Sequence, residues 1–301
     1  MELSWLEDFL ALASHRTFSR AAEARNVTQP AFSRRIQSLE AWVGTHLFVR
    51  SPQGTELTPA GKFLRVHAEE LTRSLQQVRQ ETLEVASKEA SVLSIAATHA
   101  LSFVFFPGWL RSHPLFETLG PLNLISDSME ACEQIMLRGE AEFLLCHHHQ
   151  DVVTRFESSQ YKSIVVGKDV LVPLCAPDEN GKAKWTLPGL PSSPSRFLSY
   201  SAQSGLGRIL TTVWSKAKDP VFLDNVFTGQ LAVTLLSMAR QGHGIAWLPA
   251  TLAAEDIAAG RLIDPAQGSL SVGVDIRLIR PVHRQPRTAE VFWKAIGDIN
   301  S

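Results

Sequence analysis

The stretch Thr17–Arg50, TFSRAAEARNVTQPAFSRRIQSLEAWVGTHLFVR, decides the fold of the N-terminal part of this chain. Its first part, TFSRAAEA, predicts a short helix. The following Arg25-Asn26-Val27 predicts a turn, because asparagine tolerates the positive backbone angles that a tight helix–helix turn needs. Thr28 suits an N-cap, and Pro30 falls in the first turn of a second helix, where its missing N–H costs nothing. The stretch therefore predicts two helices joined by a tight turn.

The predicted second helix has an apolar face and a polar face. Phe32, Ile36, Leu39 and Val43 recur at helical spacing and predict a buried stripe. The other face suits the DNA major groove, since Gln pairs with adenine, Arg pairs with guanine, and Ser can bond a base edge or a phosphate. An ordinary helix pair with a solvated polar face shows the same spacing, so spacing alone leaves both interpretations open. The candidate DNA-binding residues of this helix are Thr28, Gln29, Pro30, Ser33, Arg34 and Gln37.

Local charge and a predicted hairpin support the DNA-binding interpretation. Between residues 24 and 55 one acid, Glu40, faces four basic residues that suit phosphates: Arg25, Arg34, Arg35 and Arg50. Residues 47–50 and 56–58 predict two short strands joined by SPQGT, which form a small wing. Arg50 and the glycine-containing tip can reach the DNA backbone or the minor groove, so Arg50 completes the candidate DNA-binding set.

A long helix is predicted from the Thr58-Pro59 cap to about Lys88, and its apolar residues repeat every seven positions. Such a repeat is typical of a coiled-coil seam, although the same stripe could pack on its own chain. Pairing of two long helices would relate two recognition helices by a two-fold axis, which suits an inverted repeat in DNA. The predicted dimerisation residues are Leu64, Leu71, Leu75, Val78 and Val85.

Residues 3–66 resemble the winged helix-turn-helix of LysR-type transcriptional regulators. The resemblance is carried by AAEARNVTQPAFSRRIQSLE (21–40), Gly44, LFVR (47–50) and LTPAG (57–61), at the spacing of that family. It implies a protein that binds double-stranded operator DNA as a homodimer or homotetramer. It also implies an effector-binding domain in the second half of the chain.

The composition of the 301 residues is that of a globular protein of two or three domains, because hydrophobic residues are 45%, charged residues 20% and the net charge is −1. No secretory signal is expected, since the chain starts without a basic segment or a cleavage site. No apolar run approaches the ~20 residues of a membrane span. A cytoplasmic protein is therefore expected. The cysteines are too scattered for a secreted disulfide framework; they are Cys132, Cys146 and Cys175.

From Val92 onward, short apolar strands alternate with helical segments, which predicts a parallel-type α/β fold. This half resembles the LysR effector-binding region, built like a periplasmic binding protein from two α/β subdomains. The strings that carry the resemblance are 92–107, LRGEAE (137–142) and ARQGHGIAWLP (239–249). The predicted strands are 92–96, 122–126, 143–146, 164–176, 197–200, 221–226, 244–248 and 274–279, and the predicted closing helix is 287–299.

The expected organisation has three parts. A winged helix-turn-helix DNA-binding domain covers 1–58, a linker and dimerisation helix covers 59–90, and an effector-binding domain covers 91–301. Within the last part, subdomain one is expected at 91–165 with 270–301, and subdomain two at 166–269.

A ligand site is expected where the turns after the strands meet, because open α/β sheets bind ligands at the carboxyl ends of strands, next to helix N-termini. The turns carry hydroxyls that can bind a ligand or cap a helix, and they carry no Arg or Lys. A monoanionic or neutral, partly aromatic ligand is therefore expected. The candidate ligand-binding residues are Thr98, His99, Ser102, Ser128, Met129, Tyr200, Ser204 and Thr228. The resemblance implies that Thr98, His99 and Ser102 face Tyr200, Ser204 and Thr228 across a cleft.

Two alternative functions remain open. THALSFVFFP (98–107), LSYSAQSGLGR (198–208) and GHGIAWLP (242–249) resemble the hypochlorite-responsive LysR subgroup, in which methionine oxidation is the proposed switch. Here Leu206 occupies the turn where the key methionine is expected, so redox sensing would rest on Met129, at a cleft turn. A more distant alternative is a small-molecule-binding protein or enzyme with an accessory DNA module, for which no catalytic set stands out.

The run His147-His148-His149 does not predict a metal site. Consecutive residues on a strand point in different directions, and no further Cys or His spacing completes a tetrahedral set. We therefore expect no metal, no cofactor and no enzymatic activity.

Overall fold

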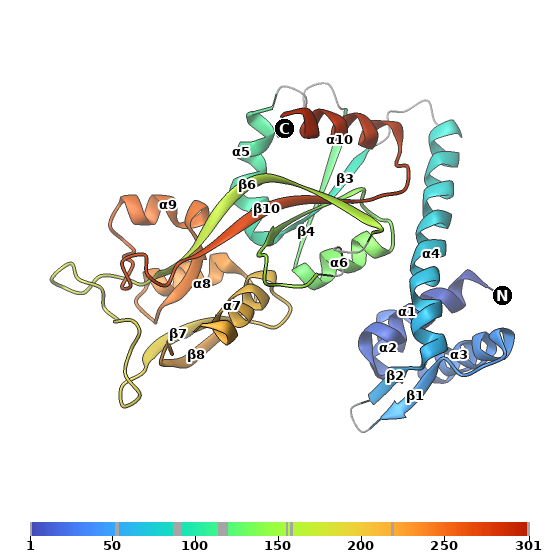
Figure 1. Cartoon of the computed structure of the whole chain (residues 1–301), viewed down its shortest axis with the longest axis horizontal. Helices are drawn as coiled ribbons and strands as arrows, with labels where there is room; N and C mark the ends of the chain where they lie inside the picture. The colour runs from blue at the N-terminus through green and yellow to red at the C-terminus, as the bar shows by residue number, and fades with distance from the viewer. Residues whose placement is uncertain are drawn as a thin grey trace. The chain divides into compact units, whose positions relative to one another are not determined.

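The computed structural model describes residues 2–51, 54–86, 92–113, 120–154, 156, 159–217 and 220–299. The chain forms two compact units, an N-terminal unit of residues 1–88 and a C-terminal unit that contains most of residues 89–301 (Figure 1). None of the helices in these described ranges is both long enough and apolar enough to cross a bilayer.

The N-terminal unit has the predicted winged helix-turn-helix arrangement. Its helices pack around a core in which Phe9, Leu12, Phe32 and Leu39 are fully buried. Asn26, in the turn, has a φ of 53°, the positive backbone angle that the sequence predicts. The elements in order are α1 (Leu3–His15), α2 (Phe18–Ala24), α3 (Gln29–Val43), β1 (Phe48–Ser51), β2 (Gly54–Leu57) and α4 (Pro59–Ala86).

The wing is the antiparallel pair β1–β2, whose strands end within two residues of the predicted positions. The Thr55 N–H donates to the Arg16 carbonyl oxygen at 2.7 Å, which fixes the hairpin to the turn between α1 and α2. Gly54 has a φ of 119°, and a Cβ there would lie 2.6 Å from the same oxygen. The wing can therefore dock on this turn only with glycine at position 54.

Helix α4 starts in close contact with the segment that leads into the wing. The Thr58 hydroxyl donates to the His46 carbonyl oxygen at 2.9 Å and accepts from the Gly61 N–H at 3.0 Å, which caps the helix. A Cβ at Gly61 would lie 2.1 Å from the Leu47 carbonyl oxygen. The missing side chain at Gly61 therefore lets α4 approach the backbone at Leu47.

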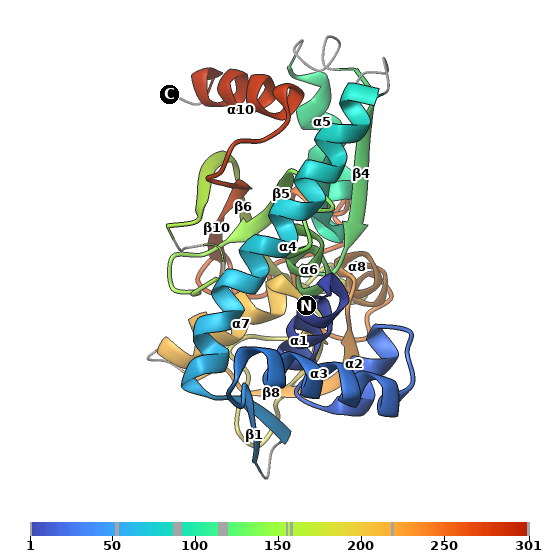
Figure 2. The same ribbon diagram turned by 90° about the vertical axis from the view of Figure 1, so that its right-hand side faces the viewer.

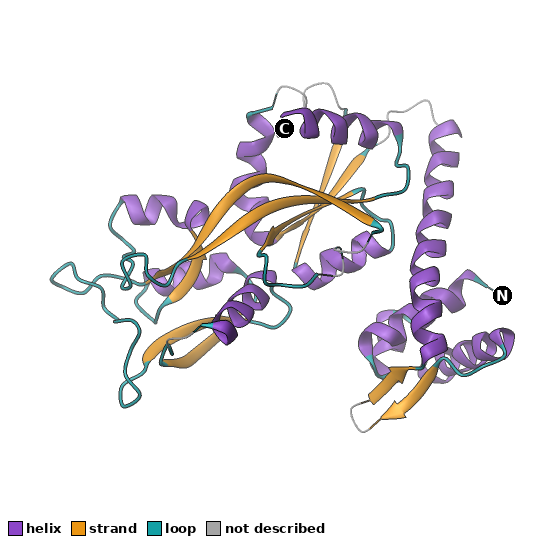
Figure 3. Cartoon of the chain, viewed as in Figure 1, coloured by secondary structure: helices purple, strands orange, loops and turns teal. Residues whose placement is uncertain are grey.

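The C-terminal unit alternates strands and helices, as predicted (Figure 3). The predicted closing helix is confirmed over its whole range, and the predicted strands are found with shifted ends. The elements in order are β3 (Leu93–Thr98), the π-helical η1 (Leu101–Phe105), α5 (Phe106–Arg111), β4 (Leu122–Asp127), α6 (Met129–Leu137), β5 (Phe143–His148), β6 (Tyr161–Leu174), β7 (Ser195–Tyr200), α7 (Gly205–Lys216), β8 (Leu223–Gly229), α8 (Ala232–Arg240), β9 (Ala246–Pro249), α9 (Ala250–Ala258), β10 (Val272–Pro281) and α10 (Arg287–Ile299).

Six strands form one mixed sheet in the order β4-β3-β5-β10-β6-β9. β3 runs parallel to β4 and β5, whereas β10 is antiparallel to both of its neighbours and β9 is antiparallel to β6. The predicted α/β class is therefore confirmed, and the sheet also contains antiparallel pairs, which the alternation of strands and helices did not predict. The reason is topological: β6 carries the chain from one subdomain to the other and β10 brings it back, so these adjacent strands must run in opposite directions.

β6 and β10 lie side by side in both views and connect two hydrophobic cores (Figures 1 and 2). On β6, Val166 packs in the core of the first subdomain and Leu171 in that of the second. On β10, Val274 packs in the second core and Ile276 in the first, beside a register shift between Ile276 and Arg277. The second subdomain also contains the separate parallel pair β7–β8.

Candidate functional site

The polar face of α3 is the candidate DNA-recognition surface. Thr28, Gln29, Pro30, Arg34 and Gln37 are exposed and Ser33 is partly exposed. On the other side of the helix Phe32, Ile36 and Leu39 of the predicted apolar stripe are buried, and Val43 is partly buried. The Thr28 hydroxyl makes no capping hydrogen bond, so the helix does not use it. Arg34 Nε lies 3.4 Å from the Pro30 carbonyl oxygen, at the long end for a hydrogen bond. The residues predicted to read DNA are therefore presented to solvent on a helix anchored in the core.

A buried carboxylate engages two of the four arginines that the sequence assigns to phosphates. Asp8 is fully buried, accepts from Arg25 Nε at 2.8 Å and pairs with Arg35 Nη1 at 3.3 Å. Arg25 also pairs with Glu7. Burial disfavours the charge on Arg25, but the two carboxylates outweigh this effect and raise its pKa. Arg25 and Arg35 therefore join α2 and α3 to α1, which corrects their assignment to the phosphate-binding surface.

At two predicted functional positions, Arg50 and Val85, the structure describes the backbone and not the side chain. Their predicted contacts, with DNA and with a partner helix, stay predictions.

Helix α4 leaves an apolar surface uncovered by the rest of the described unit. Leu71, Leu75 and Val78 are 49%, 49% and 58% exposed. By contrast, Leu64 packs against the core of its own unit, where Ala68 is fully buried. The start of the predicted seam therefore packs on its own chain, and the described positions from Leu71 onward are free to meet another helix.

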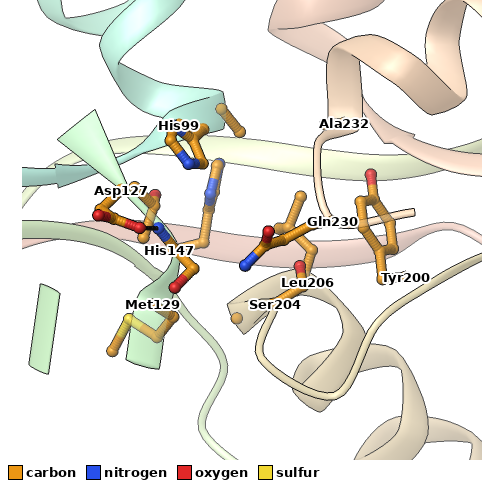
Figure 4. Close-up of a pocket in the computed structure, with 13 residues that line it drawn as sticks. His99, Asp127, Met129, His147, Tyr200, Ser204, Leu206, Gln230 and Ala232 are labelled. Carbon is orange, nitrogen blue, oxygen red and sulfur yellow. Dashed lines mark hydrogen bonds between the residues drawn. The ribbon is translucent and has the colours of Figure 1, made fainter. Parts of the chain in front are cut away.

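A small cavity lies in the C-terminal unit where four strand-to-helix turns converge (Figure 4). The turns precede η1, α6, α7 and α8, and they come from both subdomains. The cavity volume is about 30 Å³, space for roughly one or two water molecules. The predicted ligand-binding residues that line it are Thr98, His99, Ser128, Met129, Tyr200 and Ser204.

Several of these polar groups also serve the fold, as expected for hydroxyls at helix starts. Ser128 Oγ accepts from the Ala131 N–H at 3.2 Å, and Ser204 Oγ accepts from the Gly207 N–H at 3.4 Å. The buried Tyr200 hydroxyl donates to the Trp247 carbonyl oxygen at 3.0 Å, and burial raises its pKa. Tyr200 therefore lines the cavity as a neutral ring, with its hydroxyl engaged elsewhere.

Two predicted ligand-binding residues, Ser102 and Thr228, do not line the cavity. The Ser102 hydroxyl lies 2.6 Å from that of Ser126 and donates to the His99 carbonyl oxygen at 3.0 Å. The Thr228 hydroxyl lies 2.8 Å from that of Ser199. In this conformation, both residues make hydrogen bonds within their own subdomain.

Sequence reasoning missed other lining residues, among them Asp127, His147 and Gln230. The Asp127 carboxylate accepts from the Ser128 N–H at 2.6 Å. The His147 side chain is 3% exposed, and its Nε2 lies 3.6 Å from Asp169 Oδ2, too far for a hydrogen bond. The His147-His148-His149 run is visible in the sequence, but the run itself does not indicate which of its side chains lines a cavity. In the described residues no three His, Cys, Asp or Glu side chains gather to hold a metal.

Asp169 is held as an anion beneath His147. Asp169 lies on β6. Its carboxylate accepts from the Val170 N–H at 2.7 Å and from the N–H of Thr251, at the start of α9, at 3.2 Å. Burial disfavours its charge, but His147 and the Thr251 hydroxyl outweigh this effect and lower its pKa. The cavity-lining His147 therefore has a negatively charged neighbour that does not itself line the cavity.

Two buried polar atoms of cavity-lining residues, Thr98 Oγ1 and His147 Nε2, have no hydrogen-bond partner within the described protein. Buried polar groups are normally satisfied, so Thr98 Oγ1 can accept or donate to a water molecule or a ligand in the cavity, whereas His147 Nε2 faces the Asp169 carboxylate. The cavity is thus chemically suited to a small polar ligand.

Family models match almost the whole chain. Residues 3–62 match the model of the bacterial regulatory helix-turn-helix protein, lysR family, and residues 86–299 match the LysR substrate binding domain.

Relatives and solved structures match over similar lengths. The HTH-type transcriptional regulator YjiE of Escherichia coli (strain K12) is 30% identical to this chain, and the alignment covers 99% of this chain and 95% of YjiE. The structure of Vibrio fischeri DarR in complex with DNA is 29% identical over 98% of each chain, with a TM-score of 0.56. The structure of full-length HypT of Salmonella typhimurium, a hypochlorite-specific LysR-type transcriptional regulator, is 28% identical to this chain. The match covers 100% of this chain and 98% of the HypT chain, with a TM-score of 0.60.

Proposed function

This chain belongs to the LysR family of bacterial transcriptional regulators, and we propose that it binds an inverted-repeat operator through α3 and the wing, under the control of a small ligand in the cleft. The observation that carries the DNA-binding half is the exposed polar face of α3, with Gln29 and Arg34 presented to solvent. The DNA complex of DarR, at 29% identity over nearly the whole chain, supports it.

Arg34→Ala and Gln29→Ala test the docking of α3. Each variant is expected to lose about 1–3 kcal/mol of operator affinity, because each removes a side chain that can pair with a base edge. Fluorescence anisotropy with a labelled operator measures the loss, and a scrambled duplex of the same length is the control. Equal losses on both duplexes would indicate phosphate contacts instead, and unchanged operator affinity in both variants would contradict the docking.

We further propose that α4 pairs with α4 of a second chain. Its uncovered apolar side chains from Leu71 to Val78 are the supporting observation. Leu71→Asp with Val78→Asp is expected to convert the oligomer to monomers at micromolar concentration, since two buried charges without partners would face each other across the seam. Light scattering measures the mass. Gln76→Asp, on the same helix but off the seam, is the control; a stable wild-type monomer would refute the pairing.

The ligand proposed for the cleft is small and monoanionic or neutral. Its oxygens would meet Thr98 Oγ1 and the backbone N–H groups at the helix starts. The lining includes no Lys or Arg and does include the Asp127 carboxylate, so a dianion would lack a counter-charge. A ligand with an aromatic ring exceeds the present cavity of about 30 Å³ and requires the subdomains to move apart about β6 and β10.

Methionine oxidation at Met129 is the second candidate, because Met129 lines the same cavity and is 5% exposed. A sulfoxide would place a polar oxygen between α6 and α7. A cysteine switch has less support, since all three cysteines are buried and burial raises the pKa of Cys132 and of Cys146 to about 12.

Met129→Leu separates the two candidates. It is expected to leave the ligand response of operator binding intact and to abolish any response to hypochlorite. Thr98→Val is expected to do the reverse, because it removes a cavity hydroxyl and no sulfur. Operator binding with and without each added compound measures both responses. If neither variant changes any response, the cavity is not the sensor.

A further inference from the structure

Helix α7 belongs to the second subdomain, yet two of its basic side chains reach acids of the first. Arg208 Nη1 donates to Glu133 Oε1, on α6, at 2.7 Å. Lys216 lies about 12 Å further along the helix. Its Nζ donates at 2.8 Å to Oδ1 of Asp151, a residue of the segment after β5. The helix is therefore fastened to the first subdomain near both of its ends.

The two pairs differ in burial. The Glu133 side chain is 5% exposed, and Arg208 supplies the charge that compensates it. Moving Arg208 away would leave a buried carboxylate without that compensation unless water entered, so this inner pair strongly favours the closed arrangement. The outer pair of Lys216 and Asp151 is more exposed, and Lys216 lowers the pKa of Asp151 by its hydrogen bond. In water such a pair contributes less.

The inner pair is directly connected to the cavity. Glu133 lies four residues after Met129, and Arg208 lies four residues after Ser204, so each shares a side of its helix with a cavity-lining residue. Met129 also packs against the start of α7, because a Cβ added at Gly205 would lie 3.2 Å from the Cβ of Met129. The cavity and the ion pair are neighbouring parts of one contact between α6 and α7.

We propose that Arg208–Glu133 and Lys216–Asp151 form a latch that holds the two subdomains closed over the cavity. The chain crosses between the subdomains along β6 and β10, whereas α7 touches the first subdomain through side chains. A hinge motion about the crossing strands that separates α6 from α7 must break the Arg208–Glu133 pair, and it also breaks the Lys216–Asp151 pair where it moves α7 away from the segment after β5. The two ion pairs therefore contribute to the free-energy difference between the closed and the open cleft. To shift this equilibrium, a ligand must bind one of the two forms more tightly than the other by a comparable free energy. This inference rests on the proposed sensing role of the cavity.

Distances between spin labels on the two subdomains test the latch in the full chain without DNA or ligand. Lys294→Cys on α10 and Glu255→Cys on α9 provide exposed attachment sites, and the three native cysteines are buried. Labelled chains are diluted into unlabelled chains so that distances within one chain dominate. Arg208→Gln and Lys216→Glu are each expected to increase the population at longer distances, roughly tenfold for Arg208→Gln, which removes a charge-assisted hydrogen bond.

A charge swap and a matched control sharpen the test. Lys216→Glu with Asp151→Lys is expected to restore the closed distance, because both positions are accessible to water and the pair re-forms with reversed sign. Arg240→Gln is the control. Arg240 pairs with the buried Asp256 inside the second subdomain, so opening of the cleft leaves this pair intact and its loss is not expected to change the distances between the labels.

Two results would overturn the latch: unchanged distances in both Arg208→Gln and Lys216→Glu, or equal opening in Arg240→Gln. Operator binding by the wild-type chain is measured in parallel. If the wild type does not bind the operator, the proposed regulatory function is contradicted, whereas the latch is judged from the label distances alone.

Discussion

Replacing Gly61 by alanine is expected to destabilise the N-terminal unit by about 3 kcal/mol or more. The new Cβ would lie 2.1 Å from the Leu47 carbonyl oxygen and 2.9 Å from Leu57 Cδ2. A backbone oxygen cannot move aside as a flexible side chain can, and this one also accepts the Thr58 N–H at 3.0 Å. Helix α4 must therefore shift away from the wing, and the Thr58 cap is lost with it.

Native-state hydrogen exchange of the full chain measures this loss, because it reports α1–α4 separately from the C-terminal unit. Gly108→Ala is the control. Gly108 is also helical, but a Cβ there meets nothing within 4 Å. Alanine has the higher helix propensity, so Gly108→Ala is expected to be neutral or to stabilise α5 by up to about 1 kcal/mol. Unchanged protection of α4 in Gly61→Ala would show that the close approach to Leu47 is not needed.

The second large effect is expected at Asp8. Asp8→Ala should cost about 3 kcal/mol in the N-terminal unit, because it breaks two ion pairs of a buried carboxylate and leaves Arg35 without its carboxylate partner, while Arg25 keeps Glu7. We expect the lower end of the range for such changes, since Arg25 and Arg35 are 28% and 37% exposed and can still reach water. Operator affinity should fall as well, because Arg25 and Arg35 connect α2 and α3 to α1.

Asp8→Asn separates charge from shape. It keeps the size and one acceptor oxygen, so its loss of stability should be smaller than that of Asp8→Ala. Glu23→Ala, an exposed acid on α2, is the control and should stay within about 0.5 kcal/mol of wild type. Hydrogen exchange of α1–α3 peptides and operator titration provide both measurements. If Asp8→Ala matches Glu23→Ala, the buried pairs do not hold the helices together.

The N-terminal unit could be predicted from the sequence because its signals are local. Thr28, Pro30 and the stripe from Phe32 to Leu39 define α3 within a dozen residues, and Asn26 marks the turn through its own backbone preference. Each signal depends on neighbours in the chain, and the structure has α3 starting directly after Thr28, although the Thr28 hydroxyl makes no capping hydrogen bond. Six ligand-site candidates lie at the cavity for a similar reason, since turns at the carboxyl ends of strands gather at one edge of each sheet, and the cavity is lined by such turns from two sheets.

What the sequence did not reveal depends on partners far away along the chain. Nothing near Arg25 or Arg35 shows that Asp8 binds them, and nothing near Glu133 shows that Arg208 meets it. The direction of β10 was missed because strand periodicity is the same for both directions, and only the return from the second subdomain fixes it. The role of His147 could not be predicted from its neighbours in the sequence, because its burial beside Asp169 and its position at the cavity depend on elements that are far apart in the chain. Local patterns determined which segments fold and the family they belong to, whereas long-range packing decided which charges are paired and which polar atoms stay free for a ligand.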